Sequence, residues 1–271
     1  MNIYRALLMI ITVAGPMGCL NRGDGREITA SGYVEATEVR VGTKVSGTLI
    51  QLAVDEGDQV TKDQLIAKID PVDLELSLRA AQAEKTQYEA DLRGAEKDYR
   101  RMQDLLDAGS GTGKARDDAK SRFDMTAGRV AVSIARIGQL EQQIKDTTVR
   151  SPIGGVVTQK LVEQGELLAP GSTLVVVTDL NDSWLTAYVG EPDLPRIRLG
   201  QEAKLLTDAG ITRPGKITYI ASTAEFTPKN VQTKDERVKL VYKIKVAMEN
   251  SDGLFKPGMP AQTQIEVSGA K

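Results

Sequence analysis

Val45–Asp70 reads VSGTLIQLAVDEGDQVTKDQLIAKID, and Ile153–Asp179 repeats it as IGGVVTQKLVEQGELLAPGSTLVVVTD. Superimposed, the two stretches match at glycines, a glutamine, a valine and acidic pairs: Gly47 with Gly155, Gln51 with Gln159, Val54 with Val162, Asp55 with Glu163, Gly57 with Gly165 and Asp58 with Glu166. Both alternate apolar and polar residues and break at glycine, which is typical of half-buried strands joined by tight turns. One such half cannot bury its apolar face alone, so the sequence predicts that the two halves pack together. Gly57 and Gly165 stand where the chain must reverse, and we expect positive φ at both.

The segment between the copies has a helical period. Asp70 followed by Pro71 favours a helix start, with Asp70 as N-cap and Pro71 in the first turn. Alternating steps of four and three residues then select a seam whose sole charged member is Lys85: Leu74, Leu78, Ala81, Lys85, Tyr88, Leu92, Ala95, Tyr99, Met102 and Leu106. After Gly109–Gly113 the same steps resume through Ala119, Phe123, Thr126, Val130, Ser133, Ile137, Leu140 and Ile144. Residues 71–148 are therefore predicted to form an antiparallel coiled-coil hairpin about 50 Å long. Such a hairpin either extends to contact a partner protein or serves only to dimerise the chain or to space its domains.

The glycine-rich tip of this hairpin, Gly109–Gly113 followed by Lys114, invites comparison with a phosphate-binding loop. That motif needs glycine at Ala108, Ser or Thr at Ala115 and a preceding strand, none of which this segment offers. We interpret it as a turn, with Thr112 as N-cap of the returning helix.

Composition excludes several classes of function. The chain has 35 basic and 37 acidic residues, so it lacks the basic excess that nucleic-acid binding requires. It contains no histidine, and Cys19 is its one cysteine. Zinc sites, cysteine proteases and Ser/His/Asp triads therefore lack their residues. The inventory leaves carboxylate or lysine chemistry open, but no cluster of such residues favours it, so the sequence predicts no catalytic, cofactor-binding or metal site and no enzyme.

The N-terminus reads as an export signal. Arg5 precedes the apolar run Ala6–Ala14, which is shorter than the roughly 20 residues of a membrane-spanning helix. Gly18 before Cys19 resembles the cleavage site of bacterial lipoproteins, so we expect a signal segment over residues 1–18 and lipidation at Cys19. Pro16 and Met17 are atypical of that site, which leaves ordinary secretory cleavage and an uncleaved anchor as alternatives.

After the second copy, alternating strands separated by Pro/Gly turns predict a small β-barrel over residues 180–268. The barrel comes after three earlier parts: the first half together with an N-terminal strand (30–70), the hairpin (71–148) and the second half (149–179). The predicted fold class is therefore mixed and the protein elongated and multidomain, with a split β-domain, an inserted helical hairpin and a barrel.

In this order the parts resemble periplasmic adaptors of the HlyD type, also called membrane fusion proteins, over everything after the signal. In that family a lipoyl-like (biotinyl-lipoyl) domain is split by a helical hairpin and followed by a β-barrel. The stretch Ala224–Thr233, AEFTPKNVQT, together with Arg237 is most similar to adaptors of ABC-type exporters.

The resemblance implies two candidate sites. At the hairpin tip, family members carry an Arg, a Leu and a Ser that contact an outer-membrane channel of the TolC type, and Arg101, Leu105 and Thr112 stand at those positions. Residues of these types also suit an ordinary helix end. In the barrel, one loop either contacts the transporter or ties two strands together: Glu225, Phe226, Thr227, Pro228, Lys229, Asn230 and Arg237.

The resemblance further implies a periplasmic protein anchored to the inner membrane of a Gram-negative bacterium by an N-terminal lipid or anchor. It would link an ABC-type inner-membrane transporter to a TolC-type channel and self-associate into a ring, with a hexamer expected. The alternative is an adaptor of a proton-driven drug pump of the RND type. A lipoyl or biotin carrier is disfavoured, because the hairpin replaces the turn that would bear the modified lysine.

Overall fold

The computed structural model describes residues 27–226 and 240–267, which fall into two compact units. One unit, Val34–Trp184 with Glu249–Met259, contains the repeated halves and the helical hairpin. The other is built from the described parts of Met1–Tyr33, Leu185–Met248 and Pro260–Lys271. Two long strands, β1 (Glu27–Gly42) and β8 (Thr173–Gly190), contribute to both units, so the boundary predicted near residue 180 falls inside a continuous strand.

The repeated halves form equivalent sets of strands. The first half supplies β2 (Gly47–Leu52), β3 (Gln59–Val60) and β4 (Leu65–Ile69), and the second supplies β5 (Thr148–Arg150), β6 (Gly155–Lys160), β7 (Leu167–Leu168) and the start of β8. The short strands cross over between the halves. β7 pairs with β2 through Leu168 and Gly47, and β3 pairs with β6 through Val60 and Gly155. Each half therefore completes a sheet of the other.

A single apolar core joins the two halves. Leu49 and Ile66 from the first half and Leu174 and Val177 from the second are all fully buried within it. Val54 and Val162, which are equivalent positions, both belong to the same cluster. This confirms the prediction that the halves pack together.

The repetition extends to individual hydrogen bonds. The Gly57 N–H donates to the carbonyl of Val157, and the equivalent Gly165 N–H donates to the carbonyl of Leu49, each at 2.8 Å. Gly57 has φ 91° and Gly165 has φ 97°, so the predicted positive φ is confirmed at both. In each turn a carboxylate accepts from the backbone three residues earlier: Asp58 from the N–H of Asp55 at 2.8 Å and Glu166 from that of Glu163 at 3.1 Å.

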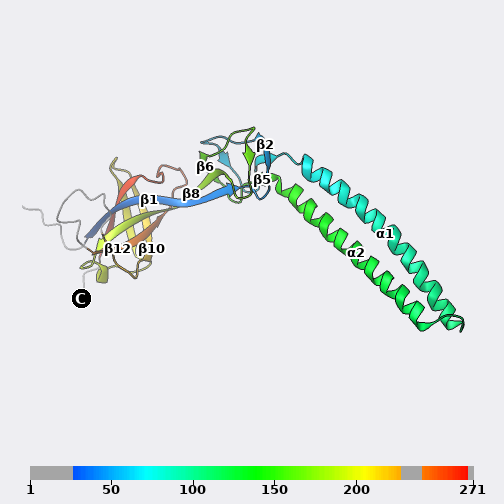
Figure 1. Ribbon diagram of the computed structural model, residues 1–271. Coiled ribbons are helices and arrows are strands. Elements are labelled where there is room, and N and C mark those ends of the chain that lie inside the picture. Colours follow the sequence, from blue (N-terminus) through cyan, green and yellow to red (C-terminus); the bar gives the residue numbers. More distant parts are fainter. Residues whose placement is uncertain (1–26, 227–239, 268–271) are drawn as a thin grey trace, which may run out of the picture. The chain divides into compact units, whose positions relative to one another are not determined.

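The hairpin consists of α1 (Val72–Asp107) and α2 (Gly113–Asp146), which run side by side (Figure 1). Every residue assigned to the two seams is buried or half-buried, and the rings of Tyr99 and Phe123 stack across the seam with centroids 6.0 Å apart. α1 begins one residue later than predicted, because Pro71 rather than Asp70 occupies the N-cap position. Asp70 still accepts a hydrogen bond from the Val72 N–H at 3.0 Å, which satisfies one of the free donors of the first turn.

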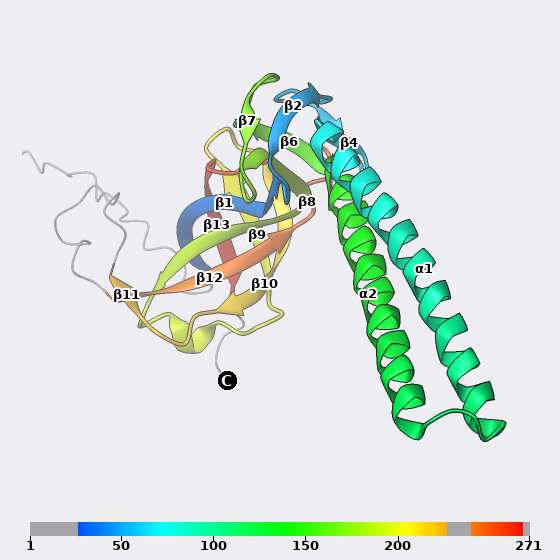
Figure 2. The same cartoon turned by 45° about the vertical axis from the view of Figure 1, so that its right-hand side comes forward.

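The second unit is a six-stranded barrel (Figure 2). Its further strands are β9 (Glu202–Thr207), β10 (Thr212–Ile220), β12 (Leu240–Met248) and β13 (Pro260–Glu266), with η1 (Leu194–Arg196) and the short β11 (Glu225–Phe226) beside them. The order β12-β10-β9-β13-β1-β8 is closed by pairing of β12 with β8. The start of β1, which the sequence analysis grouped with the first half, pairs with β13 in this barrel from Glu27 to Tyr33.

Glu249–Met259, which the sequence analysis grouped with the barrel, lies in the first unit, whose two packed halves we call the sandwich. Asn250 is fully buried there and donates to the carbonyls of Leu180 at 3.1 Å and Phe255 at 2.8 Å. The Phe255 side chain is also fully buried. This segment is therefore held to the middle of β8 by a satisfied buried amide.

Candidate functional site

The hairpin tip is closed by a helix-capping motif. After α1 ends, Gly109 adopts φ 74°. The Gly109 N–H donates to the carbonyl of Leu106 and the Ser110 N–H to that of Leu105, each at 2.9 Å. These two bonds form a Schellman motif, which requires a left-handed residue at this position. Backbone hydrogen bonds thus fix where the chain turns.

Gly111 and Thr112 then start the returning helix. A Cβ on Gly111 would lie 2.8 Å from the backbone nitrogen of Leu106, so the close approach of the loop to α1 requires glycine. The Thr112 hydroxyl accepts from the Ala115 N–H at 3.2 Å, which confirms the predicted N-cap. The hydroxyl at this position has a role within the fold.

The predicted tip residues lie outside the seam. Arg101 and Leu105 are one turn apart on α1, each directly before a seam residue, so they share one flank of the helix. Leu105 is 40% exposed, and the Arg101 side chain is 62% exposed while paired with Asp98 one turn earlier. Thr112 is exposed at the start of α2. The tip therefore offers a cation and an apolar side chain that the hairpin does not need for its own packing.

Charges at the tip oppose the helix dipoles. The last turn of α1 contains Asp104 and Asp107 and no basic residue, and the first turn of α2 contains Lys114 and Arg116 and no acidic residue. A helix favours anions at its N-terminus and cations at its C-terminus, so both ends carry the less stable charge. Departures of this kind from local rules are expected at functional sites.

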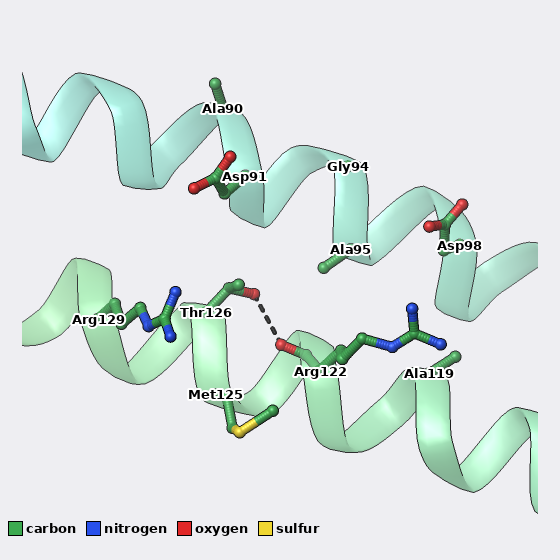
Figure 3. Close-up of a pocket in the computed structure, with 10 residues that line it drawn as sticks. All are labelled: Ala90, Asp91, Gly94, Ala95, Asp98, Ala119, Arg122, Met125, Thr126 and Arg129. Carbon is green, nitrogen blue, oxygen red and sulfur yellow. Dashed lines mark hydrogen bonds between the residues drawn. The ribbon is translucent and has the colours of Figure 1, made fainter.

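A groove of about 510 Å³ lies between the helices in the outer half of the hairpin (Figure 3). Small residues of α1 and α2 leave its space open: Ala90, Gly94, Ala95 and Ala119. Charged residues line it from both helices: Asp91 and Asp98 from α1, Arg122 and Arg129 from α2. The sequence analysis missed this groove. Its signal was the seven-residue spacing of acids on one helix and of arginines on the other, each directly before a seam residue.

The candidate barrel loop is described only at its start. Glu225 and Phe226 form β11, which pairs with the first residues of β12. Glu225 Oε1 accepts from Lys243 Nζ at 2.9 Å, and this contact raises the pKa of the Lys243 ammonium. Six further predicted residues lie outside the described ranges: Cys19, Thr227, Pro228, Lys229, Asn230 and Arg237.

Within residues 27–226 and 240–267, no three acidic or cysteine side chains converge in a way that could hold a metal ion. In the same ranges, no helix has the length and apolar character of a membrane span.

Comparison with known proteins defines the class of this chain. Residues 37–180, which include both halves and the hairpin between them, match the family model described as "RND MFP, barrel-sandwich hybrid domain". Fold and match together define a non-enzymatic adaptor. The chain belongs to the membrane fusion protein family.

Relatives of similar length support this assignment. The chain is 30% identical to a UPF0194 membrane protein of Citrobacter koseri, over 94% of this chain and 93% of that protein. It is 29% identical to a UPF0194 membrane protein of Enterobacter sp. strain 638, over 93% of each.

Solved structures share the fold. MacA from Actinobacillus actinomycetemcomitans matches with a TM-score of 0.74 at 21% identity, over 90% of this chain and 79% of that chain. ZneB from Cupriavidus metallidurans matches with a TM-score of 0.55 at 25% identity, over 90% of this chain and 99% of that one. The membrane fusion protein Spr0693 from Streptococcus pneumoniae matches with a TM-score of 0.68 at 17% identity, over 89% and 100%.

Proposed function

We propose that this protein is the periplasmic adaptor of a tripartite efflux or secretion system. In this role it links an ABC-type transporter of the inner membrane to an outer-membrane channel of the TolC type. Copies of the chain form a ring, with six expected, and the hairpins reach the channel. Cys19 carries the lipid that tethers the adaptor to the inner membrane.

The inserted hairpin carries this proposal. Its helices of 36 and 34 residues extend on the order of 50 Å at 1.5 Å per residue. They end in a tip closed by backbone hydrogen bonds, where Arg101 and Leu105 are exposed and where the charges oppose the helix dipoles. An element that only spaced two domains would gain nothing from such a tip, whereas a contact with another protein would use it.

The type of transporter separates two versions of the proposal. The ABC type is favoured by the AEFTPKNVQT stretch and Arg237. The RND type is favoured by the family model, whose description contains that term. Cross-linking the full chain in its native membrane and identifying the captured transporter distinguishes them. An ATP-binding subunit with a multispan permease supports the first, and one large proton-driven pump supports the second.

The tip contact is tested with Arg101→Asp in the full chain, measuring capture of the host's purified TolC-type channel. We expect capture to fall at least about tenfold, because the reversed charge meets the partner surface that Arg101 complements. Arg79→Asp is the matched control, since Arg79 is an exposed arginine near the other end of α1. Circular dichroism verifies that both variants keep their helices. Capture that is equal in both variants would refute the tip contact.

A further inference from the structure

One end of the barrel contains both the start of β1 and the turn that precedes β9. Glu27, the first residue of β1, pairs with Glu266 of β13. The side-chain amide of Gln201 donates to the Glu266 carbonyl at 2.8 Å. The turn Arg198–Gln201 therefore lies beside the start of β1. We call this end of the barrel the rim.

Leu199 occupies the tip of this turn. The Gln201 N–H donates to the Arg198 carbonyl at 3.2 Å, and Gly200 has the positive φ, 82°, that a type II turn requires at its third position. The Arg198 N–H donates to the side-chain oxygen of Gln201 at 2.9 Å, and the Gly200 N–H donates to the Ile217 carbonyl at 2.8 Å. Leu199 is 66% exposed. Hydrogen bonds thus hold in place a turn that presents a leucine to solvent.

Two further large apolar side chains are exposed at the rim. β10 runs antiparallel to β9 and β12 runs antiparallel to β10, so the end of β10 and the start of β12 both lie where β9 begins. Tyr219, one residue before the end of β10, is 43% exposed, and Leu240, the first residue of β12, is 46% exposed. Tyrosine is enriched where proteins meet the headgroups of a membrane.

Two cations flank the leucine. Arg198 precedes Leu199 directly and is exposed. Lys216 is exposed as well, and its Cε lies 3.5 Å from the position that a Cβ on Gly200 would occupy. Among the residues that the structure describes, neither side chain forms an ion pair. Both charges are therefore available to groups outside the chain.

Acids also lie at the rim, so it is not basic as a whole. Glu266 pairs with Lys204 at 2.7 Å, and Glu202 stands opposite Lys216 in the ladder of β9 and β10. The cations next to Leu199 suit the phosphate that every phospholipid carries, whatever its net charge. Their methylene groups can lie along apolar surface while the charged ends reach the headgroups.

The proposed lipid brings a membrane within reach of the rim. Cys19 stands eight residues before Glu27. Eight residues span at most about 29 Å when fully extended. A lipid on Cys19 that is embedded in the inner membrane therefore keeps Glu27, and the rim with it, close to the surface of that membrane.

We propose that the rim is a second membrane contact, in which Leu199 enters the headgroup region of the inner membrane and Arg198 and Lys216 bind lipid phosphates. Apolar side chains in contacts of this kind are buried about 5–10 Å into the boundary between headgroups and acyl chains. This contact rests on the proposed lipid at Cys19. It needs neither the transporter nor the channel, so the chain and a bilayer are sufficient to test it.

Quenching of tryptophan by lipid tests the contact. The full chain carrying Leu199→Trp is bound to vesicles of equal parts phosphatidylcholine and phosphatidylglycerol with brominated acyl chains, and the wild type gives the contribution of Trp184. Ala209→Trp is the matched control, because Ala209 is exposed in the turn at the other end of β9, about 20 Å away at 3.3 Å per residue. We expect quenching at position 199 at least about twofold stronger than at position 209.

Charge reversal tests the role of the cations. Adding Arg198→Glu and Lys216→Glu to the Leu199→Trp chain should lower the quenching about twofold, since the reversed charges repel phosphate. Lys62→Glu with Lys68→Glu is the control, because both lysines are exposed in the other unit, and it should leave quenching unchanged. Circular dichroism verifies that each variant keeps its fold.

Flotation of the wild type with the vesicles separates the two ways of failing. A chain that does not float with the vesicles overturns both the lipid anchor and the rim contact. A chain that floats but shows equal quenching at positions 199 and 209 overturns the rim contact alone, leaves the anchor standing and assigns the exposed rim to a protein partner instead. Equal quenching with and without the reversed charges overturns the role of Arg198 and Lys216.

Discussion

The two halves of the sandwich have one backbone pattern and two different continuations. The Thr43 hydroxyl donates to the carbonyl of Val45 and the equivalent Ser151 hydroxyl to that of Ile153, each at 2.7 Å. After β4 the chain of the first half continues into α1, whereas after the equivalent start of β8 the second half continues toward the barrel. β5, which follows α2, pairs with β4 as β1 pairs with β8. The duplicated domain therefore has two equivalent exits, one for the hairpin and one for the barrel.

This comparison explains why an adaptor can be built on a duplicated domain. Each exit consists of two neighbouring strands that leave a shared core, so a long element attached there is held at both of its ends. The hairpin is joined to this core through β4 and β5, and the barrel through β1 and β8 and also through Glu249–Met259. If the halves are a single cooperative unit, a defect in either should affect both exits.

The largest expected effect tests that cooperativity. Leu49 and its equivalent Val157 are 0% and 1% exposed in the shared core. Leu49→Ala should lower the free energy of unfolding by about 3 kcal/mol and Val157→Ala by about 2 kcal/mol, from the methylenes removed and the cavity left. Urea unfolding is followed by circular dichroism for the hairpin and by fluorescence of Trp184, the chain's one tryptophan.

Both variants should shift the two probes together. Independent halves would instead give one variant that moves only one probe, and the idea of a common core would then fail. A change at an exposed residue of the same strand, Thr48→Ala, serves as the control, since its side chain lies outside the core.

A smaller effect concerns one turn at which the halves differ. Asp63 has φ 65°, and the equivalent Gly171 has φ 90°. An L-residue with positive φ is strained, so Asp63→Gly should raise the free energy of unfolding by about 0.5 kcal/mol, part of the gain being offset by the greater freedom of glycine in the unfolded chain. Gly171→Asp should lower it by about 1 kcal/mol, and no atom within 4 Å of the added Cβ complicates that result. Thermal unfolding of both variants measures these two changes in the free energy of unfolding. If both changes have the same sign, backbone strain is not what distinguishes the two turns.

The sequence predicted what depends on local pattern. The φ values of Gly57 and Gly165, the burial of Ala81 and Ser133 in the seam and the capping by Thr112 all follow from spacing and residue type. Local pattern does not specify long-range pairing. β7 pairs with β2 of the other half, and β12 closes the barrel by pairing with β8. Both pairings depend on contacts between residues far apart in the sequence.

At the site, the same limit applies to the groove. The spacing of the charges on each helix was visible in the sequence, but which acid stands opposite which arginine depends on the register. The pair Glu84–Arg136 supplies that register only in the structure. The tip residues Arg101 and Leu105 came from the family resemblance, and the structure adds their exposure.

The smallest effect concerns a lysine that joins the two acidic turns. Lys160 Nζ lies 3.3 Å from Asp55 Oδ1 in the first half and 3.1 Å from Glu163 Oε1 in the second, whereas the equivalent of Lys160 in the first half is Leu52. The backbone N–H of Glu56, followed by Lys160, lowers the pKa of Asp55 below its ordinary value of 3.8. A carboxyl whose pKa is lowered by folding stabilises the folded state above its unfolded pKa, and this contribution is lost as the pH falls through the folded value.

Lys160→Leu should therefore remove part of the pH dependence below about pH 4 while leaving the part due to the Glu56 N–H. Because Asp55 is exposed to solvent and Lys160 is only half-buried, the difference in Tm between wild type and variant should change by at most about 2 °C between pH 5 and pH 2. Thermal unfolding across that range measures it, with Lys62→Leu as the control for loss of a surface charge. A wild-type and a variant curve that stay parallel down to pH 2 would mean that Lys160 does not couple the two acidic turns.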